Sequence, residues 1–181
     1  MLAVDDDLPL TPRRILVAGT SGAGKTTVTR RVSERLDLPW TELDALFHGP
    51  EWTPRPEFLD DVRALAAGDA WVTEWQYPGA RPILADRADL LVWLDLPFRV
   101  TSRRVSRRTV VRRARRTELW NGNQESPLHT VFTDSDHIIR WEIRSRHVLR
   151  DAVPALSSTH PDLTVVRLRT GREVERWLAR L

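Results

Sequence analysis

The chain has 181 residues, of which 41% are hydrophobic and 29% are charged. This length and composition suit one folded domain and exclude a chain that is disordered over most of its length. The sequence contains no cysteine, which excludes disulfide scaffolds, cysteine zinc sites and thiol catalysis. No apolar run approaches the ~18 residues of a membrane-spanning helix, so we expect no membrane contact.

The N-terminus and the centre of the chain differ in charge. Residues 1–11 are acidic and carry no signal pattern, so we expect a disordered acidic tail, a single domain over residues 12–181 and a cytoplasmic protein. The formal net charge is +3, yet residues 99–150 contain 13 basic and 5 acidic residues. Such a cationic segment indicates an anionic partner. Lys25 is the only lysine, and every other residue in the Lys+Arg count is an arginine.

Apolar segments alternate with segments of helical spacing along the whole chain. Five have the length and composition of buried strands, at residues 14–18, 40–43, 70–73, 90–94 and 163–168. Between and after them we expect helices at residues 28–36, 56–67, 81–87, 98–117, 130–152 and 173–181. This order predicts an α/β fold with a five-stranded parallel sheet covered by helices on both faces.

The first strand runs directly into the segment GTSGAGKTT, which matches the phosphate-binding loop pattern GxxxxGK[ST]. Its glycines let backbone N–H groups curl around phosphate oxygens, and the following helix N-terminus favours negative charge. Lys25 can reach the β- and γ-phosphates, and the Thr26 hydroxyl can bind Mg²⁺. The sequence therefore predicts binding of ATP and Mg²⁺. The expected nucleotide contacts are Gly19, Ser21, Gly22, Ala23, Gly24, Lys25, Thr26 and Thr27.

Two carboxylates follow the second predicted strand, Glu42 and Asp44. Ligands of open α/β sheets bind at the carboxyl ends of the strands. Asp44 is therefore expected to accept a proton from an attacking hydroxyl, while Glu42 contacts the substrate or orients a water on Mg²⁺. The alternative is that Asp44 only caps the next turn.

The third predicted strand ends in Glu74, which we expect to bind the metal. Asp95, after the fourth strand, is the alternative metal ligand, although it is also placed to cap the helix that follows. Trp75, Gln76 and Tyr77 are expected to form a wall of the substrate site. Arg81 is among the few arginines available there to a charged acceptor.

The helix predicted at 98–117 is dominated by arginines at spacings of three and four, which places many of them on one face. They are Arg103, Arg104, Arg107, Arg108, Arg112, Arg113, Arg115 and Arg116. Like charges at this spacing repel, so an anion is expected to compensate them. Three interpretations of this face remain: it binds phosphates in a kinase, it binds a nucleic-acid backbone, or it is simply exposed to solvent.

With these motifs the sequence resembles the small P-loop kinases of the adenylate kinase, shikimate kinase and gluconate kinase group. It is most similar to bacterial adenylate-kinase-related proteins that carry a "topology modulation" label. The resemblance implies a three-layer sandwich with strand order 2-3-1-4-5 and an arginine-rich lid over about residues 99–130. It also implies that Arg104 lies over adenine, that Arg108 contacts phosphate in catalysis, and that Glu42 and Asp44 serve substrate and metal.

The chain departs from these families at residues 74–76, where Glu-Trp-Gln replaces the Asp-Gly-Asn of the related bacterial proteins. Residues 120–123 and 127–129 match no motif, and their polar composition is typical of a mobile loop over a site. We expect transfer of the γ-phosphoryl group of ATP to a hydroxyl of a small polar molecule such as a nucleoside, sugar acid or antibiotic. A nucleoside monophosphate kinase and a nucleic-acid-associated ATPase remain the alternatives. The sequence does not indicate an oligomeric state.

Overall fold

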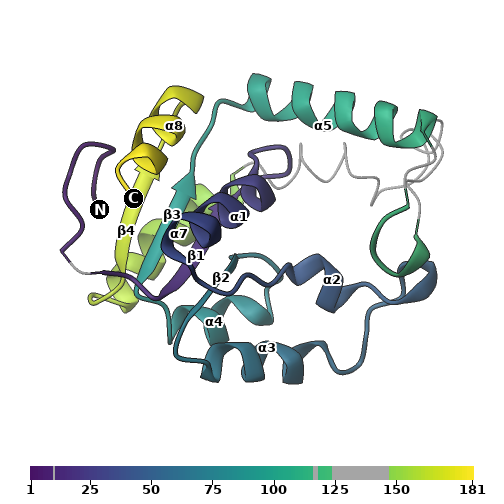
Figure 1. The fold of residues 1–181 in the computed structure, drawn as a ribbon, viewed down its shortest axis with the longest axis horizontal. Coiled ribbons are helices and arrows are strands. Elements are labelled where there is room, and N and C mark those ends of the chain that lie inside the picture. The colour runs from purple at the N-terminus through teal and green to yellow at the C-terminus, as the bar shows by residue number, and fades with distance from the viewer. Residues whose placement is uncertain (10, 116–117, 124–146) are drawn as a thin grey trace.

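The computed structural model describes residues 1–9, 11–115, 118–123 and 147–181. Its centre is a parallel sheet of four strands in the order β2-β1-β3-β4 (Figure 1). The strands are β1 (Arg14–Gly19), β2 (Trp71–Glu74), β3 (Leu90–Leu94) and β4 (Thr164–Leu168). In register, Val17 of β1 lies between Glu74 of β2 and Val92 of β3. All carboxyl ends therefore meet at one edge of the sheet.

The expectation of a fifth strand at residues 40–43 is wrong. Only Trp40 pairs with the sheet, in an isolated parallel bridge to Val72. The Thr41 N–H donates to the Val72 carbonyl at 3.1 Å, and the next helix, α2 (Leu43–Phe47), begins two residues later. Because Pro39 has no N–H and α2 starts so soon, the segment is too short for a ladder. The order 2-3-1-4-5 is thus reduced to four strands with a single bridge at the β2 edge.

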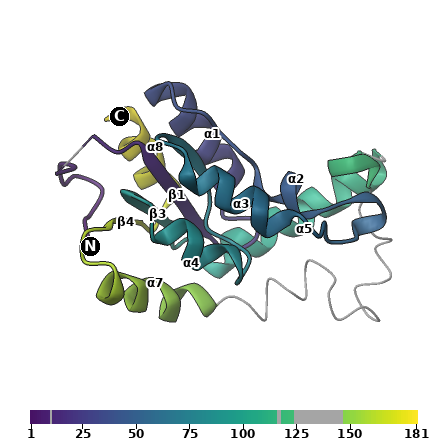
Figure 2. The same cartoon turned by 90° about the horizontal axis from the view of Figure 1, so that it is seen from below.

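Helices cover both faces of the sheet, as the sequence predicts (Figures 1 and 2). On one face lie α1 (Lys25–Leu36) and α8 (Gly171–Ala179), and on the other α3 (Phe58–Ala67), α4 (Ala80–Ala85) and α7 (Val148–Thr159). Side chains alternate along β1. Ile15 and Val17 therefore pack into the core beneath α1 and α8, and Leu16 and Ala18 into the core beneath α3, α4 and α7.

The arginine-rich helix is α5 (Phe98–Ala114), which extends past the sheet toward α2 (Figures 1 and 2). Its buried positions are Thr101, Val105 and Thr109, one per turn. Two short 3₁₀ turns, η1 (Pro50–Trp52) and η2 (Trp120–Gly122), contact one another near α2. Residues 124–146 are outside the described ranges, so much of the expected lid, residues 127–129 and most of the helix expected at 130–152 are not described.

The expectation of a disordered N-terminal tail also differs from the structure. Leu2 bridges Val166 in parallel, with its N–H 2.7 Å from the Val165 carbonyl oxygen. Asp5 pairs with Arg176 of α8 at 2.9 Å. The open edge of β4 supplies unpaired backbone groups, and Leu2, Val4 and Leu8 pack against the core, so both contacts hold this segment there. Among the described residues, no helix is long and apolar enough to cross a membrane.

Candidate active site

The phosphate loop joins β1 to α1 through residues whose backbone requires glycine. Gly22 and Gly24 have φ of 76° and 97°, which side chains other than glycine rarely adopt. Gly24 is the N-cap of α1, and the first N–H groups of that helix have no intrahelical acceptors. The backbone of the loop therefore fits the predicted cradle for phosphate oxygens.

Lys25 begins α1, and charged side chains from four other elements surround it. Burial lowers its pKa, and the carboxylates of Asp44 and Glu74 oppose this shift. Arg108 of α5 and Arg81 of α4 are near enough to lower the pKa of Lys25 further. The fold thus gathers the catalytic, metal and substrate candidates around one lysine at the carboxyl edge of the sheet.

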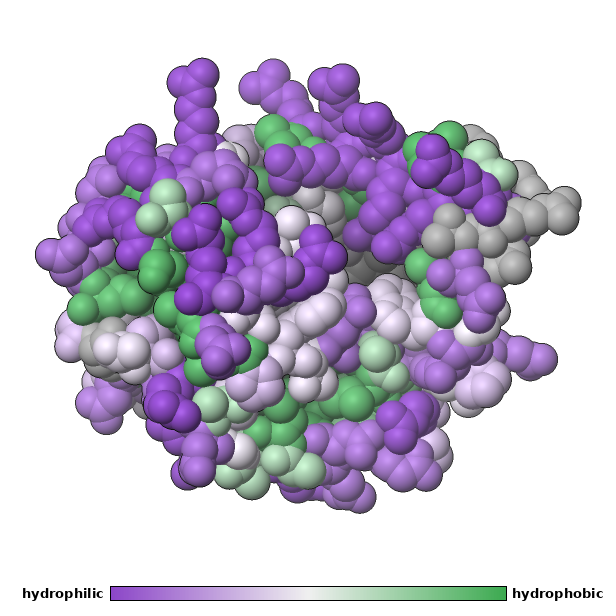
Figure 3. Space-filling view, viewed as in Figure 1, coloured by the Kyte–Doolittle hydropathy of each residue, from purple (hydrophilic) through white to green (hydrophobic). Residues whose placement is uncertain are grey.

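Arg104 lies over the phosphate loop. Its Nη1 is 3.5 Å from the carbonyl oxygen of Ala23. A Cβ on Gly24 or on Gly171, at the start of α8, would be 4.0 Å from its guanidinium nitrogens. Arg104 therefore lies near both the loop and the N-terminus of α8. In Figure 3, hydrophilic side chains project along the upper edge of the molecule, where α5 and α8 lie in Figure 1.

Asp44 lies in the first turn of α2 and its side chain is held by two donors. Gln76 Nε2 is 2.6 Å and the Tyr77 hydroxyl 2.5 Å from the same atom, Asp44 Oδ1. The N-cap of α2 is Glu42, whose side chain makes no capping bond. Asp44 is therefore not the helix cap that its position in the sequence allows.

Glu74 ends β2 and is 1% exposed. Its Oε2 accepts a hydrogen bond from the Leu43 N–H at 3.3 Å. Burial raises the pKa of Glu74 to about 7, and the Leu43 bond opposes this shift. A nearby cation would favour the ionised form, so Glu74 fits a residue whose charge depends on what binds beside it.

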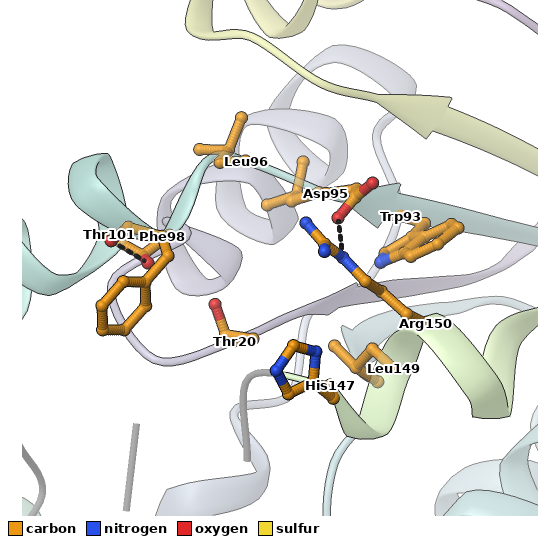
Figure 4. A pocket seen from close by; sticks show the side chains of 10 residues that line it. Thr20, Trp93, Asp95, Leu96, Phe98, Thr101, His147, Leu149 and Arg150 are labelled. Carbon is orange, nitrogen blue, oxygen red and sulfur yellow. Dashed lines mark hydrogen bonds and ion pairs between the residues drawn. The ribbon is translucent and has the colours of Figure 1, made fainter. Parts of the chain in front are cut away.

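Asp95, the alternative metal ligand, is engaged elsewhere. Its carboxylate pairs with Arg167 of β4 and lies 3.4 Å from Arg150 Nε of α7 (Figure 4). Nor does it cap α5, because the N-cap is Pro97. These pairs favour Glu74 over Asp95 for the metal.

Trp75 does not form a wall of the site, contrary to expectation. It is 4% exposed, and its Nε1 donates to the carbonyl oxygen of Arg81 at 3.1 Å. The Arg81 guanidinium lies 5.0 Å from the centre of the Trp75 ring. The role of Trp75 is to support Arg81 from within the core.

Three polar residues to which the sequence analysis assigned no role, His48, Asn121 and Asn123, connect the loop after α2 to Tyr77 and to segment 120–123. His48 Nε2 is 3.2 Å from the Tyr77 hydroxyl. The Asn121 side chain donates to the His48 carbonyl oxygen, and Asn123 Nδ2 donates to Gly49 at 2.8 Å. The unassigned segment 120–123 is therefore bound to the loop after α2. Its polar, glycine-bearing composition was the only signal in the sequence.

Two hollows lie near the candidate site. One of about 390 Å³ lies between α2 and the end of α5, lined by Glu42, Arg112, Glu118, Leu119 and Trp120. A second, of about 170 Å³, lies beside the phosphate loop at Thr20, and its lining includes Trp93, Phe98 and His147 (Figure 4). Both open at the carboxyl end of the sheet, where ligands of α/β folds bind.

The described residues contain no group of three or more His, Asp or Glu side chains that could hold a metal ion by themselves. Mg²⁺ at phosphate-transfer sites is usually held by one or two protein ligands together with phosphates and water. Thr26, at the exposed start of α1, and Glu74 fit this arrangement, which needs the nucleotide to complete it.

No protein-family model matches the sequence, and no curated protein matches it. Solved structures do. A shikimate kinase from Acinetobacter baumannii in complex with shikimate has a TM-score of 0.57 at 20% identity, over 94% of this chain and 90% of that one. A shikimate kinase from Bacteroides thetaiotaomicron has a TM-score of 0.55 at 16% identity, over 94% and 96%.

A gluconokinase from Sinorhizobium meliloti 1021 has a TM-score of 0.51 at 21% identity, over 93% of each chain. At these identities the likeness concerns the fold. The expected resemblance to shikimate and gluconate kinases is thereby confirmed as a resemblance of fold.

Proposed function

We propose that this protein is an ATP- and Mg²⁺-dependent phosphotransferase that acts on a hydroxyl of a small polar molecule. One observation carries the proposal: Lys25 of the phosphate loop lies within electrostatic reach of Asp44, Glu74 and Arg108. Phosphoryl transfer requires a cation that binds the phosphates, a carboxylate that accepts the proton of the acceptor hydroxyl, and an arginine that stabilises the charge developing on the transferred group.

In this proposal the loop backbone and Lys25 hold the β- and γ-phosphates, and Arg104 lies against the nucleoside. Thr26 and Glu74 would hold Mg²⁺, which would supply neutralisation of phosphate charge. The acceptor oxygen bonds to the γ-phosphorus as the bond to the β–γ bridging oxygen breaks and ADP leaves. The hydroxyl proton passes to Asp44. Lys25 and Arg108 stabilise the charge on the transferred group.

The similar folds support a hydroxyl acceptor over a nucleoside monophosphate, since they belong to kinases named for shikimate and gluconate. Two of the arginines on the acceptor side give a second reason, while Arg81 remains near Lys25. Arg55 pairs with Asp61 at 3.0 Å and Arg63 with Asp60 at 2.6 Å, so neither is directed at a phosphate. The closer resemblance to topology-modulation proteins rests on the sequence motifs, and it does not name an acceptor.

The test is transfer from labelled ATP, with Mg²⁺, to panels of sugar acids, polyols, nucleosides, aminoglycoside-type compounds and nucleoside monophosphates. We expect one hydroxyl class to be phosphorylated. Asp44→Asn should lower turnover by roughly 10²–10⁴-fold while ATP affinity changes little. The matched control is Asp60→Asn, an exposed acid-to-amide change away from the site.

Two other results would contradict the proposal. Transfer only to monophosphates would assign a nucleotide acceptor. Absence of any transfer, together with DNA binding that weakens steeply with salt, would assign the arginines of α5 to a nucleic-acid backbone.

A further inference from the structure

Asp44 Oδ1 has no capacity left for a substrate. A carboxylate oxygen offers two lone-pair sites, and Gln76 and Tyr77 each donate to this one atom. The Gln76 amide must present its NH₂ group here, because its oxygen would repel the carboxylate. The second oxygen, Oδ2, is therefore the one available to an acceptor hydroxyl.

The hydrogen bonds that end on Asp44 have a defined direction. A phenol has one proton, and Tyr77 gives it to Asp44, so the Tyr77 oxygen accepts at its contact with His48 Nε2. His48 Nε2 thus carries a hydrogen. Burial lowers the pKa of His48, which favours the neutral ring and leaves Nδ1 as a bare acceptor. Nδ1 is buried and has no hydrogen-bond partner among the residues that the structure describes, as such a tautomer permits.

Tyr77 is fixed by contacts on every side. Its ring stacks on Phe47 with centroids 4.2 Å apart and meets the edge of Phe58 at 5.2 Å. Its carbonyl oxygen accepts the N–H groups of Ala80 and Arg81, both at 3.0 Å, at the start of α4. Its φ of 60° lies in the left-handed region, which costs free energy for a bulky residue. Such strain is found where the surroundings hold a residue for a function.

We propose that Tyr77, with Gln76 and His48, is a positioning residue that turns Asp44 so that Oδ2 alone receives the acceptor hydroxyl. This rests on the proposed function, because it gives Asp44 the role of proton acceptor. The sequence analysis expects Tyr77 to line the substrate site. In this proposal its hydroxyl acts instead through Asp44. Proton-transfer rates depend on this kind of placement, since a misplacement of about 1 Å can cost 10²-fold.

The first test needs no acceptor. Tyr77 is the single tyrosine of the chain, so protein labelled with 3-fluorotyrosine gives one assigned ¹⁹F resonance. We expect this resonance to move in Asp44→Asn and in His48→Gln, and to stay in place in Asp60→Asn. Burial and the Asp44 charge raise the pKa of Tyr77. Ionisation should therefore begin at lower pH in Asp44→Asn than in the labelled wild type.

The second test uses the acceptor found in the panels above. Tyr77→Phe keeps the ring contacts and removes only the hydroxyl. We expect kcat to fall about 10-fold or more, with the KM for ATP unchanged and the thermal midpoint within a few degrees. Gln76→Glu, which places a like charge on Asp44, should lower kcat further.

A resonance that is indifferent to Asp44→Asn, or full kcat in Tyr77→Phe, would overturn the inference. Failure of the proposed function looks different: no acceptor is phosphorylated, while the ¹⁹F shifts still report the contact between Tyr77 and Asp44.

Discussion

Gly22 of the phosphate loop lies against the backbone of Thr101, so closely that a Cβ on Gly22 would clash with the Thr101 carbonyl oxygen. Thr101 belongs to the first turns of α5 and is 1% exposed. The loop that is built to hold phosphates and the helix that carries the arginines therefore share one rigid contact. Arg104 and Arg108 follow Thr101 by one and two turns of α5. The contact between Gly22 and Thr101 therefore fixes the distance of both arginines from the loop.

Gly22→Ala should disturb both elements. Alanine is strained at the φ of 76°, and its methyl group would also displace α5 because the obstructing atom belongs to the backbone. We expect the free energy of unfolding to fall by about 1–3 kcal/mol and the KM for ATP to rise. Denaturant unfolding and initial rates measure the two effects.

Gly122→Ala is the matched control for this change. Gly122 has a similar φ of 79°, but the nearest atom to a new Cβ is Glu118 Oε1 at 3.9 Å. It should show the cost of the left-handed backbone alone. Equal losses in the two variants would mean that the contact with Thr101 is not critical.

Lys25→Ala should reduce turnover by roughly 10²–10³-fold or more, because the variant removes a preorganised cation from developing phosphate charge. Folding should persist, since Lys25 lies at the start of α1 rather than in the core. Lys25→Arg should also fail, because a wide planar guanidinium does not replace a compact ammonium in the loop. Rates and circular dichroism together check this. Wild-type turnover in either variant would contradict the assignment of the loop.

Glu74→Gln should change how stability depends on pH. The folded-state pKa of Glu74 is raised to about 7 from an ordinary 4.5, so the folded protein binds this proton more tightly than the unfolded chain. The stability from the neutral form is complete below pH 4.5 and is lost as pH rises through 7. Relative to Glu74→Gln, the wild type should lose about 3 kcal/mol over this window.

This comparison is made by denaturant unfolding without nucleotide, from pH 4.5 to 7.5. Other groups titrate alike in both proteins, so only the difference between the two curves is used. Parallel curves would show that Glu74 is charged throughout, with its cost of burial compensated by Lys25.

The parts of this protein that the sequence predicts well are those where local chemistry determines the structure. The phosphate loop, the strand at 90–94 and the arginine helix follow from glycine spacing, an apolar run and helical periodicity. The edge of the sheet was predicted less well. Whether residues 40–43 form a strand depends on how soon α2 begins. The pairing of Leu2 depends on an open edge at Val166, 164 residues away in the chain.

The site shows the same division. Glu74 lies at the carboxyl end of β2, where the predicted strand places it. Asp44 lies in α2 and does not follow a strand, yet its carboxylate is near Lys25. Sequence reasoning did not predict that Trp75 would turn into the core while Tyr77 turned to Asp44, because that depends on the left-handed backbone at Tyr77. The link from Asn121 to His48 joins segments that are 73 residues apart, and no local pattern encodes it.

The final prediction separates the arginines of α5 by position. Arg108 is close enough to Lys25 to affect its pKa, whereas Arg104 lies against Ala23 and the start of α8. Arg108→Ala should therefore lower kcat, through loss of charge on the transferred group. Arg104→Ala should mainly raise the KM for ATP, through loss of a planar group beside the nucleoside. Arg107→Ala, an exposed position between them in the sequence, is the control and should alter neither constant by more than about twofold.

Hydrogen exchange over residues 99–115 adds a readout that is independent of turnover. An ATP analogue with Mg²⁺ should protect this helix in the wild type and protect it less in Arg104→Ala. Equal protection with and without the analogue, together with unchanged kinetics in Arg108→Ala, would remove α5 from the catalytic site.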